Sequence, residues 1–303
     1  MNYLESLIIE STKDSIRLRS PAKINLYLRV LDERPDGYHN LQNLMQVISF
    51  FDEIEIQLDD EAIVTVRCDD PEVPQGDDNI AVRAAESLIE ECGIQRGANI
   101  TIVKNIPMGA GLGGGSSNAG TVLLGLNRLL GCPADMALLQ KVAIGLGSDV
   151  PFFLHGGMAM CTGKGEVIEP FEPLPEFWVV IVYPNLIVST GSIYNIYKKK
   201  CLTLNRRGAN LLDTDIVKGL YSSALASVLH NDLEVIVEEV VPEIRIIKEE
   251  LKASGCEHVM VTGSGSSLFG LCKSRDQSAS VSSGLQELLK DERYLIVEAS
   301  NRL

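Results

Sequence analysis

The chain has 303 residues, of which 45% are hydrophobic and 22% are charged, and this composition excludes the collagen-like, disordered and mini-protein classes. At about 150 residues per domain, the length predicts two domains with sizeable cores. The 27 basic and 41 acidic residues give a net charge of −14, which repels nucleic-acid backbones and anionic membranes. We therefore expect neither a nucleic acid nor a membrane as partner.

The chain also lacks the marks of a membrane-inserted or secreted protein. No run reaches the ~18 uninterrupted apolar residues of a membrane helix, and the N-terminus has no signal-peptide pattern. The seven cysteines are odd in number, spread widely and form no Cys-x-x-Cys pair. These features predict a cytoplasmic protein with buried, reduced thiols, and neither a zinc site nor a disulfide framework.

The first segment of the chain is predicted to be a loose extension followed by sheet. Residues 1–15 show no regular pattern and are interpreted as the extension. From residue 23 to 30 the even positions are apolar, which indicates a half-buried strand with Lys23 and Asn25 on one face. Residues 34–37 have the composition of a turn, and alternation over 46–58 predicts more sheet.

The middle of the chain surrounds a glycine-rich loop. Asp77 or Asp78 is the expected N-cap of a helix that ends near Gly93. The periodicity predicts helices over residues 78–91, 119–130 and 134–144, and a strand over 99–103 just before the loop.

The second half mixes strands and helices irregularly, which favours an α+β fold over a doubly wound parallel sheet. A composition shift near Gly156 predicts an N-terminal domain over residues 1–162 and a C-terminal domain over 163–303, although the last strand could return to the first domain. The expected elements are strands at 158–161 and 178–182, a helix from Thr190, a long helix over 232–253, a strand–glycine–strand unit over 259–269, and a final helix and strand ending at 298.

The strongest motif is the run from Pro107 to Asn118, which holds five glycines within seven positions. Glycine lets a ligand approach the main chain closely, and Ser116 and Ser117 stand where a helix N-cap is expected. The free amides and the positive dipole end of such a helix bind phosphate. The run therefore predicts a polyphosphate site that uses amides and a divalent cation, in preference to a merely flexible loop.

Three other glycine loops fit less well. A Walker loop needs a lysine after the glycines, and none follows here. The Rossmann pattern is present as Gly109, Gly111 and Gly114, but the nearest acidic residue at the required distance, Asp135, opens another helix. The protein-kinase loop needs His-Arg-Asp and Asp-Phe-Gly motifs, which are absent.

Three motifs together resemble the GHMP small-molecule kinases, named for galactose, homoserine, mevalonate and phosphomevalonate kinases. They are residues 21–25 (Pro-Ala-Lys-Ile-Asn), the glycine loop, and 263–265 (Gly-Ser-Gly). The resemblance implies a ribosomal-protein-S5-domain-2-like N-terminal domain, a ferredoxin-like C-terminal domain, and ATP with Mg²⁺. It implies ATP contacts from Pro107, Met108, Gly109, Ala110, Gly111, Leu112, Gly113, Gly114, Gly115, Ser116 and Ser117.

Two further motifs resemble one branch of this family, whose substrate is a cytidine diphosphate-linked methylerythritol. They are residues 34–39 (Arg-x-Asp-Gly-Tyr-His) and 147–153 (Gly-Ser-Asp-Val-Pro-Phe-Phe), where Ser148 replaces the alanine of many members. The resemblance implies phosphorylation of the substrate 2-hydroxyl in the non-mevalonate isoprenoid pathway. The alternatives are a mevalonate-type or sugar kinase of the same family, a Rossmann-type dehydrogenase, and a non-enzymatic RNA-binding relative.

The same resemblance assigns the catalytic roles. It implies that Asp149 takes the proton of the substrate hydroxyl; the alternative, which is compatible, is that Asp149 caps the following helical turn. Lys23 would stabilise the attacking oxygen or keep Asp149 ionised, instead of being a solvated strand lysine. Asn25 would hold the substrate. No metal-ligand spacing is present, so the ligands of Mg²⁺ are not identified.

The substrate contacts are implied in the same way. Tyr38 would stack on the cytosine, His39 would hydrogen-bond its polar edge, and Tyr194 would cover the other face unless it is a core aromatic. Thr190 would add a polar contact. Gly263, Ser264 and Gly265 would line the substrate diphosphate or the rim of the site. The expected assembly is a monomer or a weak homodimer.

Overall fold

The computed structural model describes residues 2–204, 212, 222–289 and 293–303. The N-terminal half contains α1 (Tyr3–Leu7), β1 (Ile8–Ser11), β2 (Ser15–Glu33), β3 (His39–Asp59), β4 (Val64–Cys68), α2 (Ile80–Glu91), β5 (Gly97–Val103), α3 (Gly114–Leu129), α4 (Met136–Leu146), α5 (Phe152–His155), β6 (Met158–Gly163) and β7 (Val167–Phe171). The C-terminal half contains β8 (Trp178–Tyr183), α6 (Thr190–Leu204), the 3₁₀ helix η1 (Ser222–Val228), β9 (His230–Asn231), α8 (Glu234–Val240), α9 (Glu243–Ala253), β10 (Val259–Val261), β11 (Leu268–Cys272), α10 (Arg275–Leu288) and β12 (Leu295–Ser300).

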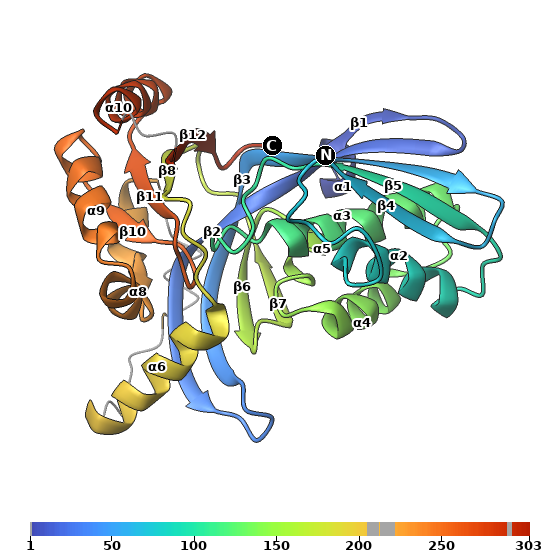
Figure 1. Cartoon of the computed structure of the whole chain (residues 1–303), viewed down its shortest axis with the longest axis horizontal. Helices are drawn as coiled ribbons and strands as arrows, with labels where there is room; N and C mark the ends of the chain where they lie inside the picture. The colour runs from blue at the N-terminus through green and yellow to red at the C-terminus, as the bar shows by residue number, and fades with distance from the viewer. Residues whose placement is uncertain (1, 205–211, 213–221, 290–292) are drawn as a thin grey trace.

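The larger sheet has the order β1-β2-β3-β5-β4, and β6 pairs with β3 and β7. Helices α2 to α5 lie against one side of it (Figure 1). Apolar side chains of β2 and β3, such as Leu18 and Ile54, pack there against α2 and α3 in a core that includes Leu88 and Leu123. The glycine loop leads into the N-terminus of α3 at the edge of this core.

The two long strands β2 and β3 run from the first half into the junction with the second (Figure 1). Their register shifts between Pro21 and Ala22 and again between Asn25 and Tyr27, and such bulges bend a strand and re-aim its side chains. In this bent part of β2, Ile24 and Leu26 join a second core with Val179 and Phe269 from the smaller sheet. The strands therefore connect the two halves of the molecule.

The smaller sheet is antiparallel with the order β10-β11-β8-β12, and α8, α9 and α10 lie beside it (Figure 1). Its strand β8 contributes Val180 and Val182 to a third core with Ile247 and Leu251 of α9. Both halves thus combine antiparallel pairs with helices on the sheet faces, and the α+β prediction is confirmed.

The N-terminal extension is not loose. Residues 3–7 form α1, and β1 pairs with β2 in antiparallel register. Leu7 is fully buried in the first core, which ties this segment to the domain. The expectation of a loose extension over residues 1–15 is therefore wrong for the described residues 2–15.

The strand carrying Lys23 and Asn25 is not half-buried either. Both side chains lie on one face as expected, yet Lys23 is 3% and Asn25 is 1% exposed. The second half of the molecule covers this polar face, since Thr262 contacts Asn25 directly. Burial of both faces is a tertiary effect that the alternation of the strand does not reveal.

Three helix boundaries differ from the prediction. Asn79, not Asp77 or Asp78, caps α2 by accepting the Ala81 amide. The N-cap of α3 is Gly113, so Ser116 and Ser117 stand in its first turn. The predicted long helix over 232–253 is two helices, α8 and α9, because Pro242 cannot donate the amide hydrogen bond that would continue the first.

The predicted division after residue 162 falls inside β6, one residue before its end at Gly163. Strands β6 and β7 pair with each other, and β9 from the second half pairs in parallel with β2. The division itself stays a prediction. The last strand, β12, pairs with β8 in the smaller sheet and not with the N-terminal half.

Among the six described cysteine side chains no disulfide occurs. Cys161, Cys256 and Cys272 are buried as expected, Cys68 and Cys92 are partly buried, and Cys132 is exposed. The side chain of Cys201 lies outside the described residues. Within the described ranges, no helix is both long and apolar enough to cross a membrane.

Candidate active site

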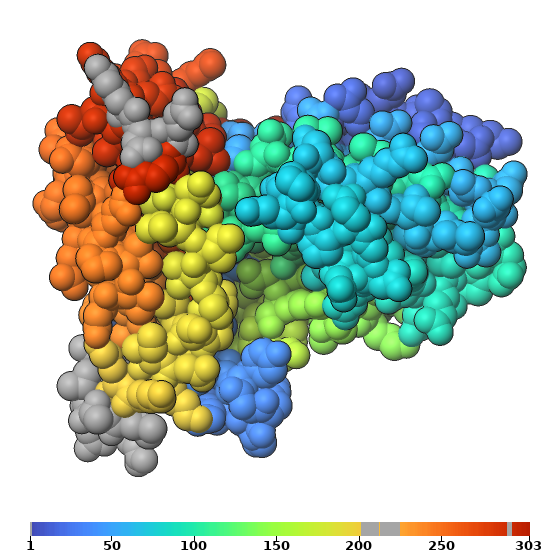
Figure 2. All heavy atoms as spheres, in the orientation of Figure 1, coloured from blue at the N-terminus to red at the C-terminus, as the bar shows by residue number. Residues whose placement is uncertain are grey.

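A cavity of about 760 Å³ brings together residues from both halves of the chain. The surface is indented where α6 meets the N-terminal half, close to the tip of the β2–β3 hairpin (Figure 2). Of the predicted site residues, those that line the cavity are Lys23, Asn25, Tyr38, His39, Pro107, Met108, Gly109, Ala110, Gly111, Gly113, Gly114, Gly115, Ser116, Asp149, Thr190, Tyr194, Gly263 and Ser264.

Three predicted residues do not line it. Leu112 is 1% exposed and belongs to the second core, and its carbonyl accepts the Lys23 amide. The hydroxyl of Ser117 lies 2.8 Å from that of Ser20 in the interior. A Cβ at Gly265 would point toward Val237 in α8. These residues support the cavity wall from behind.

The glycine loop forms one wall of the cavity from main chain. Gly109, Gly111 and Gly113 have φ values of 64°, 78° and 73°, a region that disfavours other residues. At Gly111 an added Cβ would lie 2.3 Å from the Thr262 carbonyl oxygen, so the two loops touch backbone to backbone. The N-cap of α3 makes no side-chain hydrogen bond, which leaves the amides of its first turn available to an anion.

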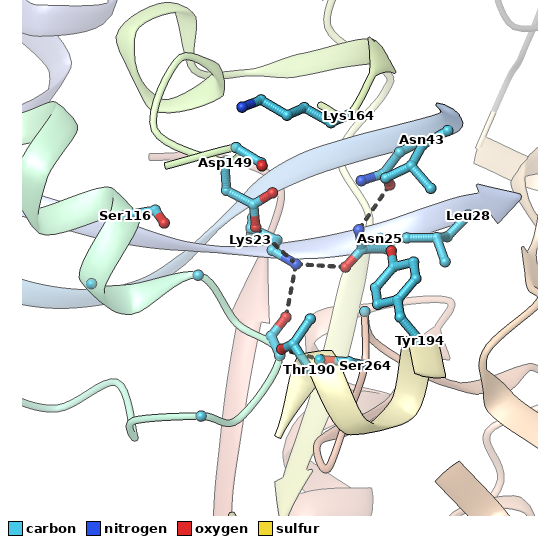
Figure 3. A pocket seen from close by; sticks show the side chains of 18 of the residues that line it. Lys23, Asn25, Leu28, Asn43, Ser116, Asp149, Lys164, Thr190, Tyr194 and Ser264 are labelled. Atoms are coloured by element: carbon cyan, nitrogen blue, oxygen red, sulfur yellow. Dashed lines mark hydrogen bonds and ion pairs between the residues drawn. The ribbon is translucent and has the colours of Figure 1, made fainter. Parts of the chain in front are cut away.

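Lys23 lies at the centre of the site (Figure 3). Its Nζ donates to Asn25 Oδ1 at 2.6 Å and to the Gly111 carbonyl at 2.9 Å, and lies 3.8 Å from Asp149 Oδ2. The lysine side chain is 4% exposed and the aspartate 34%. Burial lowers the pKa of Lys23, and the nearby carboxylate of Asp149 opposes that shift.

Asp149 is the more accessible partner of this pair and faces the cavity (Figure 3). It does not cap α5, whose N-cap is Pro151 without a side-chain hydrogen bond. The alternative interpretation, in which Asp149 caps this helix, is therefore wrong. A partly exposed carboxylate beside a buried ammonium can accept a proton from a bound hydroxyl.

Asn25 holds Lys23 in place. Its Oδ1 accepts from Lys23 and from the Thr262 hydroxyl at 3.0 Å, and its Nδ2 donates to Asn43 Oδ1 at 2.8 Å. One amide hydrogen is left for a ligand. Sequence analysis missed Asn43 and Thr262. The only available signal was that Thr262 precedes Gly263.

The opposite wall is made of side chains from the hairpin tip and α6. Tyr38 is 55% exposed. The ring of His39 stacks on that of Tyr194, with centroids 5.9 Å apart and planes at 28°. Burial lowers the pKa of His39, so its ring is neutral at neutral pH. Tyr194 also packs against the third core, as the core-aromatic alternative predicts. Its contact with a base stays a prediction.

Two further contacts join this side of the cavity to neighbouring segments. The Thr190 and Ser264 hydroxyls lie 2.8 Å apart, which joins the start of α6 to the Gly-Ser-Gly loop. Lys164, which sequence analysis missed, lines the cavity from the β6–β7 turn, and its Nζ lies 5.0 Å from the centroid of Tyr38. Its position between two glycines was the only local signal.

Comparison with known proteins places these features in a family context. The family models described as GHMP kinases N terminal domain and GHMP kinases C terminal match residues 79–157 and 217–291. The chain is 44% identical over 266 residues to the 4-diphosphocytidyl-2-C-methyl-D-erythritol kinase of Geobacter metallireducens, covering 87% of this chain and 92% of that protein. It is 40% identical to the protein of the same name from Syntrophotalea carbinolica, covering 88% and 92%.

Solved structures agree. A crystal structure of 4-(cytidine 5'-diphospho)-2C-methyl-D-erythritol kinase superposes with a TM-score of 0.77 at 32% identity, covering 93% of this chain and 98% of the other. Homoserine kinase from Cytophaga hutchinsonii gives a TM-score of 0.71 at 20% identity, covering 96% of each chain. The second likeness concerns the fold alone.

Proposed function

The chain belongs to the GHMP kinase family, and from that premise we propose that it transfers the γ-phosphate of ATP to the 2-hydroxyl of 4-diphosphocytidyl-2-C-methyl-D-erythritol. The products are the 2-phosphate and ADP. The observation that carries the proposal is the two-sided cavity, in which a main-chain phosphate wall faces an aromatic wall, with Lys23 and Asp149 between them. The names and the coverage of the relatives support this choice of substrate.

On the nucleotide side, the amides of the glycine loop and of the first turn of α3 bind the phosphates of ATP. This wall contributes few side chains, so a triphosphate can approach the backbone directly. The net charge of −14 is compatible with such a site because oriented amides replace a field of lysines.

In the reaction, the Asp149 carboxylate accepts the proton of the 2-hydroxyl while that oxygen attacks the γ-phosphorus. The bond to the β–γ bridging oxygen breaks, and ADP leaves with the electron pair. Lys23, held by Asn25 and Gly111, stabilises the negative charge that develops on the attacking oxygen. Phosphoryl transfer needs mainly positioning and charge neutralisation, which this pair supplies.

On the acceptor side, Tyr38 stacks on the cytosine and the neutral His39 hydrogen-bonds its polar edge. The stacking of Tyr194 on His39 fixes the histidine ring and supports this assignment. In this arrangement Tyr194 supports the base through His39 instead of covering its other face. Thr190, Ser264 and the backbone at Gly263 face the diphosphate.

Mg²⁺ would accompany ATP and neutralise its phosphates. Among the described residues no cluster of three His, Cys, Asp or Glu side chains could hold a metal. The chemistry present fits an ion that takes most of its ligands from phosphates and water, with the Asp149 carboxylate and the Ser116 hydroxyl facing the same cavity. A cytoplasmic, monomeric or weakly dimeric enzyme without nucleic-acid or membrane partners completes the proposal.

An ADP-release assay with the cytidyl substrate, mevalonate and galactose tests this function. We expect turnover with the cytidyl substrate alone, and competitive inhibition of it by free CDP, because only a cytidine-binding wall responds to CDP. Faster turnover of mevalonate or galactose would assign the chain to another activity of the family.

A further inference from the structure

Outside the cavity, one buried carboxylate contacts both ends of the glycine loop. Asp52, in β3, is fully buried and lines none of the three main cavities. Its two oxygens receive four hydrogen bonds from two separate segments of the chain, residues 104–106 and Asn118. A buried carboxylate is costly unless it is fully paired, so this concentration of donors marks a structural junction.

The first oxygen holds the entry to the loop. Oδ1 accepts the backbone amides of Asn105 at 2.7 Å and Ile106 at 2.8 Å. These two residues directly precede Pro107, where the cavity-lining run begins. The direction in which the chain enters the loop therefore depends on Oδ1.

The second oxygen holds the exit. Oδ2 accepts from Asn118 Nδ2 at 2.9 Å, and Asn118 lies in the first two turns of α3. The same amide nitrogen donates to Ser20 Oγ at 3.0 Å, and Ser20 Oγ lies 2.8 Å from Ser117 Oγ. The start of α3 is thereby fixed to β2 and β3.

A lysine completes the junction. Lys104 Nζ lies 2.6 Å from Asp52 Oδ2, and its side chain is 4% exposed. It also donates to the Ile106 carbonyl. A Cβ added at Gly114 would lie 2.9 Å from this nitrogen, so the ammonium packs against the first residue of α3. The charge of Asp52 offsets that of Lys104 at a helix end that would otherwise repel a cation.

We infer that Asp52 is a positioning residue for ATP: it clamps both ends of the phosphate loop, residues 107–117, so that the loop amides are aligned before the nucleotide binds. The inference rests on the proposed function for the identity of the nucleotide. Loop amides aligned in advance lower the ordering cost of binding, and a misplacement of about 1 Å can cost on the order of a hundredfold in rate. None of the hydrogen bonds of Asp52 reaches the acceptor wall, formed by the hairpin tip and α6, so binding there should not depend on it.

The test compares Asp52→Asn with Glu53→Gln. In Asp52→Asn the new amide faces two donors, Lys104 Nζ and Asn118 Nδ2, so the exit of the loop is released. Glu53 is the next residue of β3 but is partly exposed and paired with Arg17. We expect the ATP dissociation constant, measured by calorimetry without acceptor, to rise at least about tenfold in Asp52→Asn and to stay unchanged in Glu53→Gln. The CDP dissociation constant should stay within about twofold in both.

Since Asp52→Asn leaves a buried ammonium without its partner, it could fail to fold. Asn118→Ala then decides, because it keeps the ion pair and removes only the contacts of Asn118 Nδ2 with Asp52 and Ser20 at the loop exit. We expect a rise of at least about threefold in the ATP constant, again with CDP unchanged. Unchanged ATP binding together with a lower melting temperature, or equal weakening of ATP and CDP, would overturn the inference. Wild-type protein that binds ATP but does not phosphorylate the cytidyl alcohol would overturn the proposed function, while the ATP constants would still decide the role of Asp52.

Discussion

The two walls of the cavity are built by different means. The nucleotide wall is one continuous stretch of main chain, residues 107–116, whose shape depends on glycine conformations and on buried contacts behind it. The acceptor wall combines side chains of the hairpin tip with those of α6, from segments about 150 residues apart, and its Tyr38 is 55% exposed.

This difference predicts different responses to mutation. A wall of main chain has no room for an added Cβ where the backbone is in close contact. Substitutions there are therefore expected to lower the stability of the fold as well as ligand binding. A wall of side chains can lose one group while the fold persists. Substitutions there are therefore expected to weaken the binding of one ligand only. Variants placed on each wall, and between them, test this contrast.

The largest effect on activity is expected for a variant of Asp149, which lies between the two walls. Asp149→Asn removes the proton acceptor but keeps the shape of the side chain, so kcat should fall by about 10²–10⁴. ATP and CDP binding should each stay within about twofold, because neither wall changes. Steady-state kinetics and calorimetry measure both quantities. Ser148→Ala, next to it on the cavity surface, is the matched control and should keep kcat; a kcat of Asp149→Asn within tenfold of wild type would remove this residue from the mechanism.

The next effect is on the nucleotide wall. In Gly111→Ala the new Cβ would lie 2.3 Å from the Thr262 carbonyl at a φ of +78°. We expect the free energy of unfolding in urea to drop by about 2 kcal/mol or more. In Gly115→Ala the Cβ would meet only Ile80 Cγ2 at 3.8 Å, so stability should be kept or increased. Equal unfolding midpoints for the two variants would contradict the close contact at Gly111.

A smaller effect is expected on the acceptor wall. Tyr38→Ala should raise KM for the cytidyl substrate roughly tenfold, since stacking on a base contributes about 1–3 kcal/mol. KM for ATP should not change. Tyr38→Phe keeps the ring and serves as the control. If Tyr38→Ala raises both KM values alike, the two walls are not independent.

The smallest effect is a dependence on pH. Burial lowers the pKa of His39 below its usual 6.5, so the ring is neutral above that pH and gains a proton only as the pH falls below it. Protonation removes the acceptor nitrogen, and KM for the cytidyl substrate should therefore rise as the pH falls below 6.5. In His39→Gln this rise should be absent; an equal rise in the wild type and in His39→Gln would exclude protonation of His39 as its cause.

Local patterns predicted much of the nucleotide wall. The glycine run identified the loop, and the alternation over residues 23–30 placed Lys23 and Asn25 on one face, as found. Both inferences depend on neighbours within a few positions along the chain. The roles assigned to these residues remain predictions.

Contacts between distant segments could not be predicted in this way. The half-buried interpretation of β2 failed because Thr262 covers its polar face, and Asn43 and Asp52 carry no motif of their own. The extension was misread because α1 and β1 are too short to show a period, although Leu7 is fully buried. Contacts between segments that are distant in the chain determine these features, and a single sequence does not show such contacts.

Two of the helix boundaries that were predicted wrongly are marked by residues in the sequence. Pro242 stood within the predicted long helix, where proline ends the hydrogen-bond ladder, but the apolar period on both sides favoured one helix. Asn79 directly follows the two aspartates predicted as the cap of α2, and both Asn and Asp cap well. Side-chain geometry selects among such candidates.

The hydrogen bonds between Asn25 and Thr262 join residues 237 positions apart in the chain. During synthesis at about 5–20 residues per second, the lysine that Asn25 holds waits roughly 10–50 s for its distant support to be translated. A nascent polypeptide therefore carries the translated glycine loop well before Thr262 can support Asn25 and, through it, Lys23. Catalytic competence arrives only when nearly the whole chain has left the ribosome.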